Sequence, residues 1–350
     1  MRRLPIYFLI DVSESMVGDP ILQVEEGMAR IIKALKSDPH ALETVWLSII
    51  VFAGQAKTIV PLQEIVTFYP PKFPIGSGTS LSNGLGHLMY ELRKNLIKTT
   101  VEVKGDWKPI IFLFTDGAPT DETKAAISEW KQNWQRTANL VAISFGEDAD
   151  LKLLSELTDN ILHFKNSNEK DYLKFFKWVT DSIKTSSVSV ENNSSGFELA
   201  KLDGETLSKI DLTKSYTPKY YTDNNFVVLA AKCQNTKRPY LMKYKKTVGM
   251  SSFEGIELPT RHYRLVGAYQ VDNSYFDLSY ENSSNNVIST DELQGSPTCP
   301  CCGNQFAFAA CQCGKIHCIG SDPVCTCPWC GNTGTYGFGD GGFDITRTLG

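Results

Sequence analysis

Oxygen-bearing side chains gather in three short segments that lie far apart in the chain. Asp11, Ser13 and Ser15 stand in Asp-Val-Ser-Glu-Ser, Thr79 in Gly-Ser-Gly-Thr-Ser and Asp116 in Phe-Thr-Asp-Gly. Each segment follows an apolar run or precedes a helix-like stretch, so three loops could bring these oxygens to one divalent cation. Hydroxyl and carboxylate oxygens suit hard ions such as Mg²⁺ or Mn²⁺, and Mg²⁺ keeps some of its waters. We therefore predict a cation site that leaves one coordination position for an acidic group of a partner.

Sulfur ligands gather near the C-terminus, where all but one of the ten cysteines fall between Cys299 and Cys330. Cys299-Pro-Cys-Cys302-Gly and Cys327-Pro-Trp-Cys330-Gly are two knuckles, in which the Gly after the last thiol lets backbone amides approach the sulfurs. We predict two zinc ions held by eight thiols: Cys299, Cys302, Cys311, Cys313, Cys318, Cys325, Cys327 and Cys330. Ribbon-like and cross-brace pairings use the same thiols, and both stay open.

Three further side chains that could bind zinc are not among the eight predicted ligands. Cys301 is the spare thiol of the first knuckle, His317 is a substitute ligand beside Cys318, and Cys233 is expected to be a lone buried thiol. A structural zinc contributes about 10–16 kcal/mol of apparent binding free energy, which a segment with so little apolar core needs. Crowded thiols of this spacing indicate metal binding rather than a secreted disulfide framework, so we expect a reducing compartment, the cytoplasm.

Length and charge limit the class of protein. With 350 residues and 42% hydrophobic content, the chain is expected to form two or three domains with a sizeable core. Its net charge of −4 gives no overall basic field for nucleic acid or an anionic membrane. The apolar stretch before Asp11 is short for a signal peptide and is interpreted as a strand. No membrane span is expected, because no apolar run approaches the length of about 18 residues that a bilayer requires.

Strand and helix patterns alternate through the first half of the chain. Leu4 to Ile10 is a continuous apolar run, typical of a strand buried on both faces, and Pro20 to Lys36 has apolar residues at helical spacing. Further strands are predicted at 45–53, 57–62, 109–114, 140–145 and 161–164, and further helices at 79–98, 120–134, 151–157 and 169–184. This order predicts an α/β fold with a mainly parallel sheet between two layers of helices. Ligands bind such sheets at the carboxyl ends of the strands, where Asp11 and Asp116 stand.

A composition change at residues 186–196, which are rich in Ser and Asn, marks a linker after a first domain of residues 1–185. Residues 197–292 are expected to form a small β-rich segment, with strands at 226–232, 240–245, 261–271 and 275–280. Residues 293–335 form the predicted zinc-binding domain, and 336–350 a Gly-rich tail that is either loose or folded back onto it.

The oxygen-bearing motif resembles that of von Willebrand factor A domains. Asp11-x-Ser13-x-Ser15, Thr79 and Thr115-Asp116-Gly117 match it residue for residue over residues 1 to about 185. The resemblance implies a Rossmann-like domain with a metal-ion-dependent adhesion site (MIDAS), in which the three hydroxyls contact the metal. Asp11 and Asp116 would act directly or through water. Glu14 stands where that family often has Gly, so its carboxylate either alters the metal affinity or faces solvent.

Both ends of the chain are also similar to the TerY proteins. The start through Asp11, the segment around Trp107 and Asp-Gly-Ala-Pro-Thr-Asp after Thr115 resemble them, and the cysteine-rich end resembles the metal-binding domain of TerY-like chains. TerY proteins are bacterial and linked to tellurium resistance and stress responses. The resemblance implies a role in stress-response or defence signalling, with a protein kinase and a metal-dependent protein phosphatase as partners.

The expected function is a non-enzymatic, metal-dependent protein-interaction scaffold. One alternative is a nucleic-acid-binding regulator acting through the zinc domain, but Lys315 is the only Lys or Arg between Cys299 and Cys330. Another is a metal-dependent phosphohydrolase. The sequence shows no nucleophile with a partnering base, and Asp11 lacks the second carboxylate two positions on that a phosphoaspartate enzyme uses.

Overall fold

The computed structural model describes residues 2–116, 118–145, 150–164, 169–191, 197, 199–202, 204, 207–210, 225–253, 256–279, 286–337 and 341–348. Its contacts divide the chain into two units. The first comprises Met1–Val12, Asp19–Phe73 and Thr79–Tyr221, and the second comprises Ser13–Gly18, Pro74–Gly78 and Thr222–Gly350.

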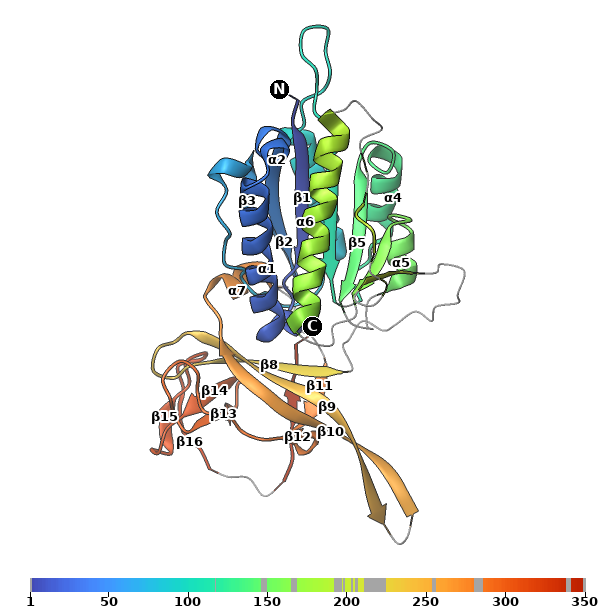
Figure 1. The fold of residues 1–350 in the computed structure, drawn as a ribbon. Helices are drawn as coiled ribbons and strands as arrows, with labels where there is room; N and C mark the ends of the chain where they lie inside the picture. The colour runs from blue at the N-terminus through green and yellow to red at the C-terminus, as the bar shows by residue number, and fades with distance from the viewer. Residues whose placement is uncertain are drawn as a thin grey trace. The chain divides into compact units, whose positions relative to one another are not determined.

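The first unit contains a seven-stranded sheet in the order β3-β2-β1-β4-β5-β6-β7 (Figure 1). Its five central strands run parallel: β1 (Leu4–Asp11), β2 (Val45–Phe52), β4 (Ile110–Thr115), β5 (Asn139–Phe145) and β6 (Ile161–Phe164). The edge strands β3 (Ala56–Glu64) and β7 (Leu207–Lys209) are antiparallel to their neighbours. The predicted α/β class and mainly parallel sheet are confirmed, whereas β7 was not predicted.

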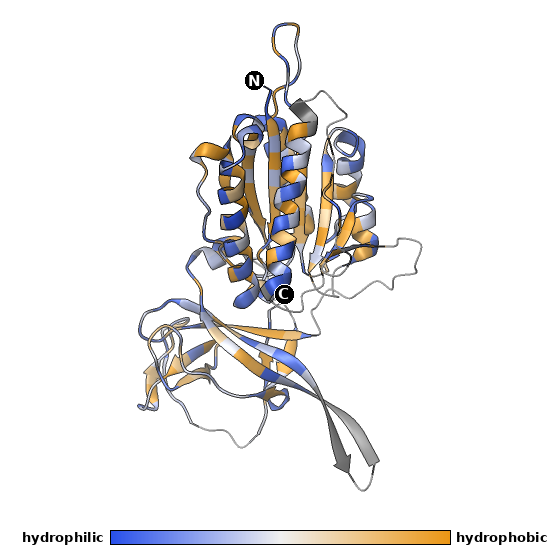
Figure 2. Ribbon diagram, in the orientation of Figure 1, coloured by the Kyte–Doolittle hydropathy of each residue, from blue (hydrophilic) through white to orange (hydrophobic). Residues whose placement is uncertain are grey.

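Helices cover both faces of this sheet. One layer contains α1 (Asp19–Lys36), α2 (Pro39–Thr44) and α6 (Glu169–Glu191), and the short turn η2 (Ile65–Thr67) lies beside it. The other layer contains α3 (Leu81–Asn95), α4 (Lys124–Asn133) and α5 (Leu151–Ser155). Because the central strands are buried on both faces, they are apolar along almost their whole length (Figure 2).

Aromatic packing fixes the first layer against the sheet. The Phe175 ring of α6 lies 5.6 Å from Phe114, 5.5 Å from Phe145 and 4.9 Å from Phe164, each on a different strand. On the other face, Trp130 of α4 is fully buried in a cluster with apolar residues of α3 and the strands. These two cores hold the strand ends, and the loops that follow them, in fixed positions.

Helix boundaries agree with the sequence at one site and differ at two. The helix predicted to begin near residue 79 is α3, which Ser80 caps by accepting the Asn83 amide at 3.2 Å. The helix predicted over 120–134 begins only at Lys124, because the Thr120 hydroxyl accepts the Thr79 amide instead of capping this helix. The last helix, α6, continues to Glu191 and so occupies half of the predicted linker.

The second unit contains a six-stranded sheet in the order β12-β10-β9-β8-β14-β13. Its strands are β8 (Phe226–Lys232), β9 (Pro239–Phe253), β10 (Ile256–Gln270), β12 (Leu293–Gln294), β13 (Phe306–Ala310) and β14 (Ile316–Ile319). Two further pairs are β11 (Val287–Ser289) with β17 (Asp344–Thr346) and β15 (Val324–Thr326) with β16 (Thr333–Thr335). The helical turns are η1 (Glu14–Met16), α7 (Ser274–Leu278) and η3 (Thr290–Glu292).

Two sequence-based expectations change here. The β-rich segment and the zinc-binding segment were separated at residue 293, but β14 pairs with β8, and both segments share one apolar core. The predicted strand at 275–280 is the helix α7, since Asp272 accepts the Ser274 amide at 2.8 Å and Tyr275 and Leu278 are both buried. Part of the predicted tail folds back as β17. Among the described residues, no helix has the length and apolar character needed to cross a bilayer.

Candidate metal centres

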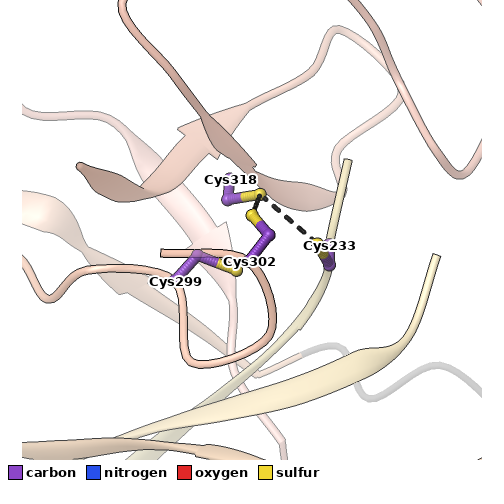
Figure 3. A group of neighbouring side chains, drawn as sticks. All are labelled: Cys233, Cys299, Cys302 and Cys318. Carbon is purple, nitrogen blue, oxygen red and sulfur yellow. Dashed lines mark hydrogen bonds between the residues drawn. The ribbon is translucent and has the colours of Figure 1, made fainter. Parts of the chain in front are cut away.

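Four thiols from distant parts of the second unit meet in a first group: Cys233, Cys299, Cys302 and Cys318. Cys233 follows β8, Cys318 lies in β14, and the other two stand in one loop before β13. The Cys318 Sγ is 3.8 Å from the Cys302 Sγ and 3.9 Å from the Cys233 Sγ. Figure 3 shows the sulfur atoms converging on one point.

A second group consists of Cys311, Cys313, Cys327 and Cys330. The Cys311 and Cys330 sulfurs are 3.7 Å apart, and the Cys313 and Cys327 sulfurs 3.9 Å apart. Because Cys318 of the first group falls between Cys313 and Cys327 in the chain, the two groups interleave. This interleaving is the cross-brace arrangement. One thiol of the first group, Cys233, comes from outside the cysteine-rich segment and directly follows β8.

The spacing of the sulfurs fits zinc. A tetrahedral ion with Zn–S bonds of about 2.3 Å holds its ligand sulfurs about 3.8 Å apart. The four distances between sulfurs, 3.7 to 3.9 Å, lie at this value. Four thiols with no oxygen or open position form a closed site, which is typical of structural rather than catalytic zinc.

The knuckle turns share one hydrogen-bond pattern. In the first, the Gly303 amide donates to the Cys299 carbonyl at 2.9 Å, and in the second the Gly331 amide donates to the Cys327 carbonyl at 3.0 Å. Both glycines have left-handed backbones, with φ of 76° and 79°. The predicted need for glycine after each knuckle therefore has a conformational reason.

Cys233 stands in the same kind of turn without its sequence signature. The Lys237 amide donates to the Cys233 carbonyl at 3.0 Å, and the Cys233 amide donates to the Arg238 carbonyl at 2.8 Å. Lys237 occupies the position that Gly303 and Gly331 hold elsewhere, with φ of 61°. Cys233 has no second Cys near it in the chain, and the residue four positions later is Lys rather than Gly. The sequence therefore shows no knuckle here, and the prediction missed this residue.

The structure changes two predicted assignments. Cys233, expected to be a lone thiol, belongs to the first group, whereas Cys325, expected to be a ligand, belongs to neither. Cys301 also lies outside both groups, as the spare-thiol prediction had it. His317 was a candidate substitute ligand; its Nδ1 faces the Cys318 carbonyl at 2.9 Å and its ring packs against Tyr336. The first group is thus complete without an imidazole.

Electrostatics at the thiols favour a bound cation. Burial raises the pKa of the Cys318 thiol well above its usual value. At Cys313, whose side chain is exposed, local desolvation and hydrogen bonds with the neighbouring thiols raise the pKa to about 12. Burial also acts upward on Cys233, but hydrogen bonds from Thr236 lower its pKa to about 7. The backbone amide of Cys313 lowers the pKa of Cys311 to about 6. Neighbouring thiols that cannot all ionise alone can do so around a divalent metal.

Three of the predicted oxygen ligands lie in the first unit, at the carboxyl edge of its sheet. Asp11 ends β1 and is fully buried, and its Oδ2 accepts the Thr115 hydroxyl at 2.9 Å. Asp116 follows β4 directly. Thr79 precedes α3, and its amide donates to the Thr120 hydroxyl at 2.9 Å while its carbonyl accepts the Thr120 amide at 2.9 Å. Thr120 is a positioning residue that the sequence did not reveal.

Asp121 extends this arrangement. Its Oδ2 accepts the Ser80 hydroxyl at 2.6 Å and the Ser82 amide at 3.1 Å, so it satisfies the first turn of α3. Thr120 and Asp121 together hold the loop that carries Thr79 against the start of the helix. Asp121 is a typical helix-capping residue that stands just before α4 in the chain, but the groups it accepts from lie at the start of α3.

The two predicted serine ligands follow Asp11 in the chain and are grouped with the second unit. The Ser13 and Ser15 hydroxyl oxygens are 3.0 Å apart. Glu14 is fully buried, and its Oε1 accepts the Tyr275 hydroxyl at 2.6 Å, so its carboxylate does not face solvent. The Lys243 ammonium donates to the Ser15 carbonyl at 2.6 Å. Burial, followed by the Glu14 carboxylate, raises the pKa of Tyr275 well above its usual value.

Two protein-family models match separate parts of the chain, close to the main segments of the two structural units. A model of the von Willebrand factor type A domain matches residues 6–177, and a model of the TerY-C metal binding domain matches residues 223–350. A search of curated proteins gives no match.

Solved structures give distant similarities. Proximal thread matrix protein 1 from the mussel byssus, with a zinc occupied MIDAS motif, is 16% identical with a TM-score of 0.37; the match covers 53% of this chain and 46% of that one. The chain thus spans about half the length of the mussel protein. A von Willebrand factor type A protein from Catenulispora acidiphila is 12% identical with a TM-score of 0.39, covering 80% of this chain and 69% of that one.

Proposed function

The chain is a TerY-like protein that joins a von Willebrand factor type A domain to a TerY-C metal binding domain, and from that architecture we propose a non-enzymatic, metal-dependent interaction scaffold. Mg²⁺ or Mn²⁺ would be held by Asp11, Thr79 and Asp116, together with the Ser13 and Ser15 hydroxyls that follow Asp11 in the chain. When bound, the ion supplies a Lewis-acidic position for a carboxylate of a partner protein.

The observation that carries the proposal is the placement of Asp11, Thr79 and Asp116. All three stand at the edge of the sheet where its parallel strands end, which is where this fold class binds ligands. Their side chains offer only oxygen, the donor type that Mg²⁺ and Mn²⁺ prefer. The Thr115 hydroxyl donates to Asp11, and the Thr79 amide donates to the Thr120 hydroxyl. These bonds orient two of the proposed ligands, as outer partners of metal ligands generally do.

The thiol groups have a structural task in this proposal. Two zinc ions would hold the 222–350 region in one conformation and so keep a second docking surface rigid. The closed four-sulfur geometry supports this role, because a site without an open position has no place for a substrate.

Partners and setting follow from the TerY resemblance. We expect protein partners, including a protein kinase and a metal-dependent protein phosphatase, in a bacterial stress-response or defence signalling system in the cytoplasm. Von Willebrand factor type A domains are generally interaction domains rather than catalysts. Fold analogy alone supports this part of the proposal.

A titration tests the oxygen site directly. Mg²⁺ and Mn²⁺ are titrated calorimetrically into the full chain, into Ser13→Ala with Ser15→Ala, and into the control Ser128→Ala, whose hydroxyl lies on the exposed side of α4. Loss of two ligands should weaken binding by roughly 100-fold or more, with the control unchanged. Equal affinity in the double variant would remove these serines from the site.

A second experiment tests the function. Tagged chain is used to capture proteins from its own cells with and without Mg²⁺, and proteins are identified by mass spectrometry. Partners of the proposed kind require both Mg²⁺ and the two serines. Turnover of phosphate esters or nucleoside triphosphates that is lost in Asp116→Ala would instead show that the protein is an enzyme.

A further inference from the structure

A cavity of the first unit lies at the edge of its sheet opposite the oxygen ligands, where the strands begin. Its volume is about 810 Å³. The cavity is lined by the C-terminal ends of α3 and α4, the start of β5 and the loop 96–109, which projects as the teal loop in Figure 1. Since Arg2 lines the cavity and Asp11 ends the following strand, the length of β1, about 26 Å, separates it from the oxygen ligands.

The loop that forms one wall is tied firmly to the sheet. The Arg3 guanidinium donates to both carboxylate oxygens of Asp106, at 2.8 and 2.6 Å, and Asp106 Oδ2 also accepts the Ile97 amide at 2.8 Å. The Arg2 Nε donates to the Gly105 carbonyl at 2.6 Å. The hydrogen bond and charge of Asp106 raise the pKa of Arg3. A wall held by this many bonds keeps its shape without a ligand.

The floor of the cavity is apolar and aromatic. Two indoles, Trp107 and Trp134, stand beside Leu92, Leu96 and Pro109. Flat apolar surfaces of this kind pack well against a planar ring. The side chains of Asn133 and Asn139 add amide donors and acceptors at the edge.

The rim is positively charged in a chain whose net charge is −4. Arg2, Arg93, Lys98 and Lys108 line the cavity, and Asp106 is the one acidic residue among the lining residues. That carboxylate is already paired with Arg3. Arg93 is paired with Glu129. Arg2 donates to the Gly105 and Asp106 carbonyls, which are neutral, and its guanidinium lies 3.7 Å from the centre of the Trp107 ring. The rim therefore keeps an excess of positive charge that suits an anionic ligand.

The Trp134 side chain, which lines the cavity, contains a hydrogen-bond donor without an acceptor among the described residues. Within the part of the chain that the structure describes, the Trp134 indole N–H is buried and has no hydrogen-bond acceptor. Burying a donor without an acceptor destabilises a protein, so such a group needs an explanation. A ligand that carries a ring nitrogen or carbonyl into the cavity would supply the acceptor.

We propose that this cavity binds a nucleoside phosphate. A heterocyclic base packs between the indoles and accepts from Trp134, and the asparagine amides contact its edge. The phosphates lie at the rim among Arg2, Lys98 and Lys108. The cavity volume is in the range of small-molecule sites and exceeds what a base alone fills. This inference is independent of the proposed metal-dependent interaction, which uses the other edge of the sheet.

The test titrates the full chain with ATP, AMP, adenosine, pyrophosphate and a hexaglutamate peptide, in buffer without Mg²⁺ so that the oxygen ligands recruit no phosphate. Heat and tryptophan fluorescence both report binding. ATP and AMP should saturate the site, and adenosine and pyrophosphate should bind at least about tenfold more weakly, because each lacks half of the recognised group.

Matched charge reversals locate the site. Lys98→Glu with Lys108→Glu should weaken nucleotide binding by at least about tenfold, because phosphate then meets two carboxylates. Lys33→Glu with Lys57→Glu makes the same change in net charge on exposed residues outside the cavity and should leave affinity within about twofold. Trp134→Phe, which removes only the N–H and one ring, should weaken binding several-fold.

Three outcomes would overturn the proposal. The first is absence of saturable nucleotide binding. The second is pyrophosphate or hexaglutamate binding as tightly as ATP, which would assign the rim to a simple anion or an acidic peptide. The third is an equal loss in the Lys33 and Lys57 control, which would mean that only the overall charge matters.

Discussion

The Cys233 sulfur lies 3.9 Å from the Cys318 sulfur, although 85 residues separate them in the chain. The contact is made because β8, which Cys233 follows, pairs with β14, which contains Cys318. The metal centre and the sheet therefore depend on each other: pairing brings the thiols together, and a bound ion would hold the two strands in register.

Cys233→Ser should reduce bound zinc from about two ions to about one per chain, since three thiols no longer close a tetrahedral site. Zinc is measured by mass spectrometry after removal of loosely bound metal. Cys325→Ser serves as the matched control, because Cys325 is buried but outside both groups, and should keep both ions. Full zinc in the first variant, or loss in the second, would contradict the assignment.

Thr120→Val should weaken Mg²⁺ binding by roughly tenfold, although Thr120 is not a proposed ligand. The valine keeps the shape of the side chain but removes the hydroxyl that accepts the Thr79 amide. Calorimetric titration gives the affinity, and Thr137→Val, an exposed change in the same unit, is the control. If Mg²⁺ binds equally to both variants, Thr120 has no part in positioning Thr79.

His87 should make the first unit less stable in mild acid. Burial lowers the pKa of His87 below its usual 6.5, outweighing the Glu91 carboxylate, which raises it. The unfolded chain then binds a proton before the folded one, so stability is complete above pH 6.5 and is lost as pH falls toward the folded pKa. Urea midpoints at about pH 7.5 and 5.5 measure the effect, and His87→Gln, which can still bond Thr58, should show a smaller difference. An unchanged difference would exclude His87 as its source.

Two glycines on helices of the first unit should respond oppositely to alanine. A Cβ on Gly27 of α1 would overlap the Phe176 ring of α6, so Gly27→Ala should destabilise the unit by about 1–3 kcal/mol. Gly86 of α3 is exposed with open space around it, so Gly86→Ala should stabilise by about 0.5–1 kcal/mol. Denaturant unfolding measures both. Similar effects of the same sign would mean that the α1–α6 approach does not require glycine.

Local patterns predicted most of the first unit. The buried runs that became β1, β4 and β6 were visible because strands covered on both faces contain little but apolar residues. Contacts across the chain were not visible. Thr120 has the sequence of a helix cap, and only the position of the neighbouring loop decides that its hydroxyl accepts from Thr79. The strand predicted at 275–280 failed for a similar reason, because aromatic residues fit a short buried helix as well as a strand.

The amino-acid sequence was enough to show which donor chemistry is present: oxygen ligands at the ends of parallel strands, and thiols in knuckles closed by glycine. These features are local, so residue type and spacing report them. Which thiols come together depends on the folded chain, since Cys233 joins the first group through a strand pairing and Cys325 is left out although it stands two residues from Cys327. The tertiary structure also decided where charge collects, as Arg2, Lys98 and Lys108 meet around one cavity only after the chain has folded. Proximity in space depends on the packing of the whole unit, which no short stretch of sequence encodes.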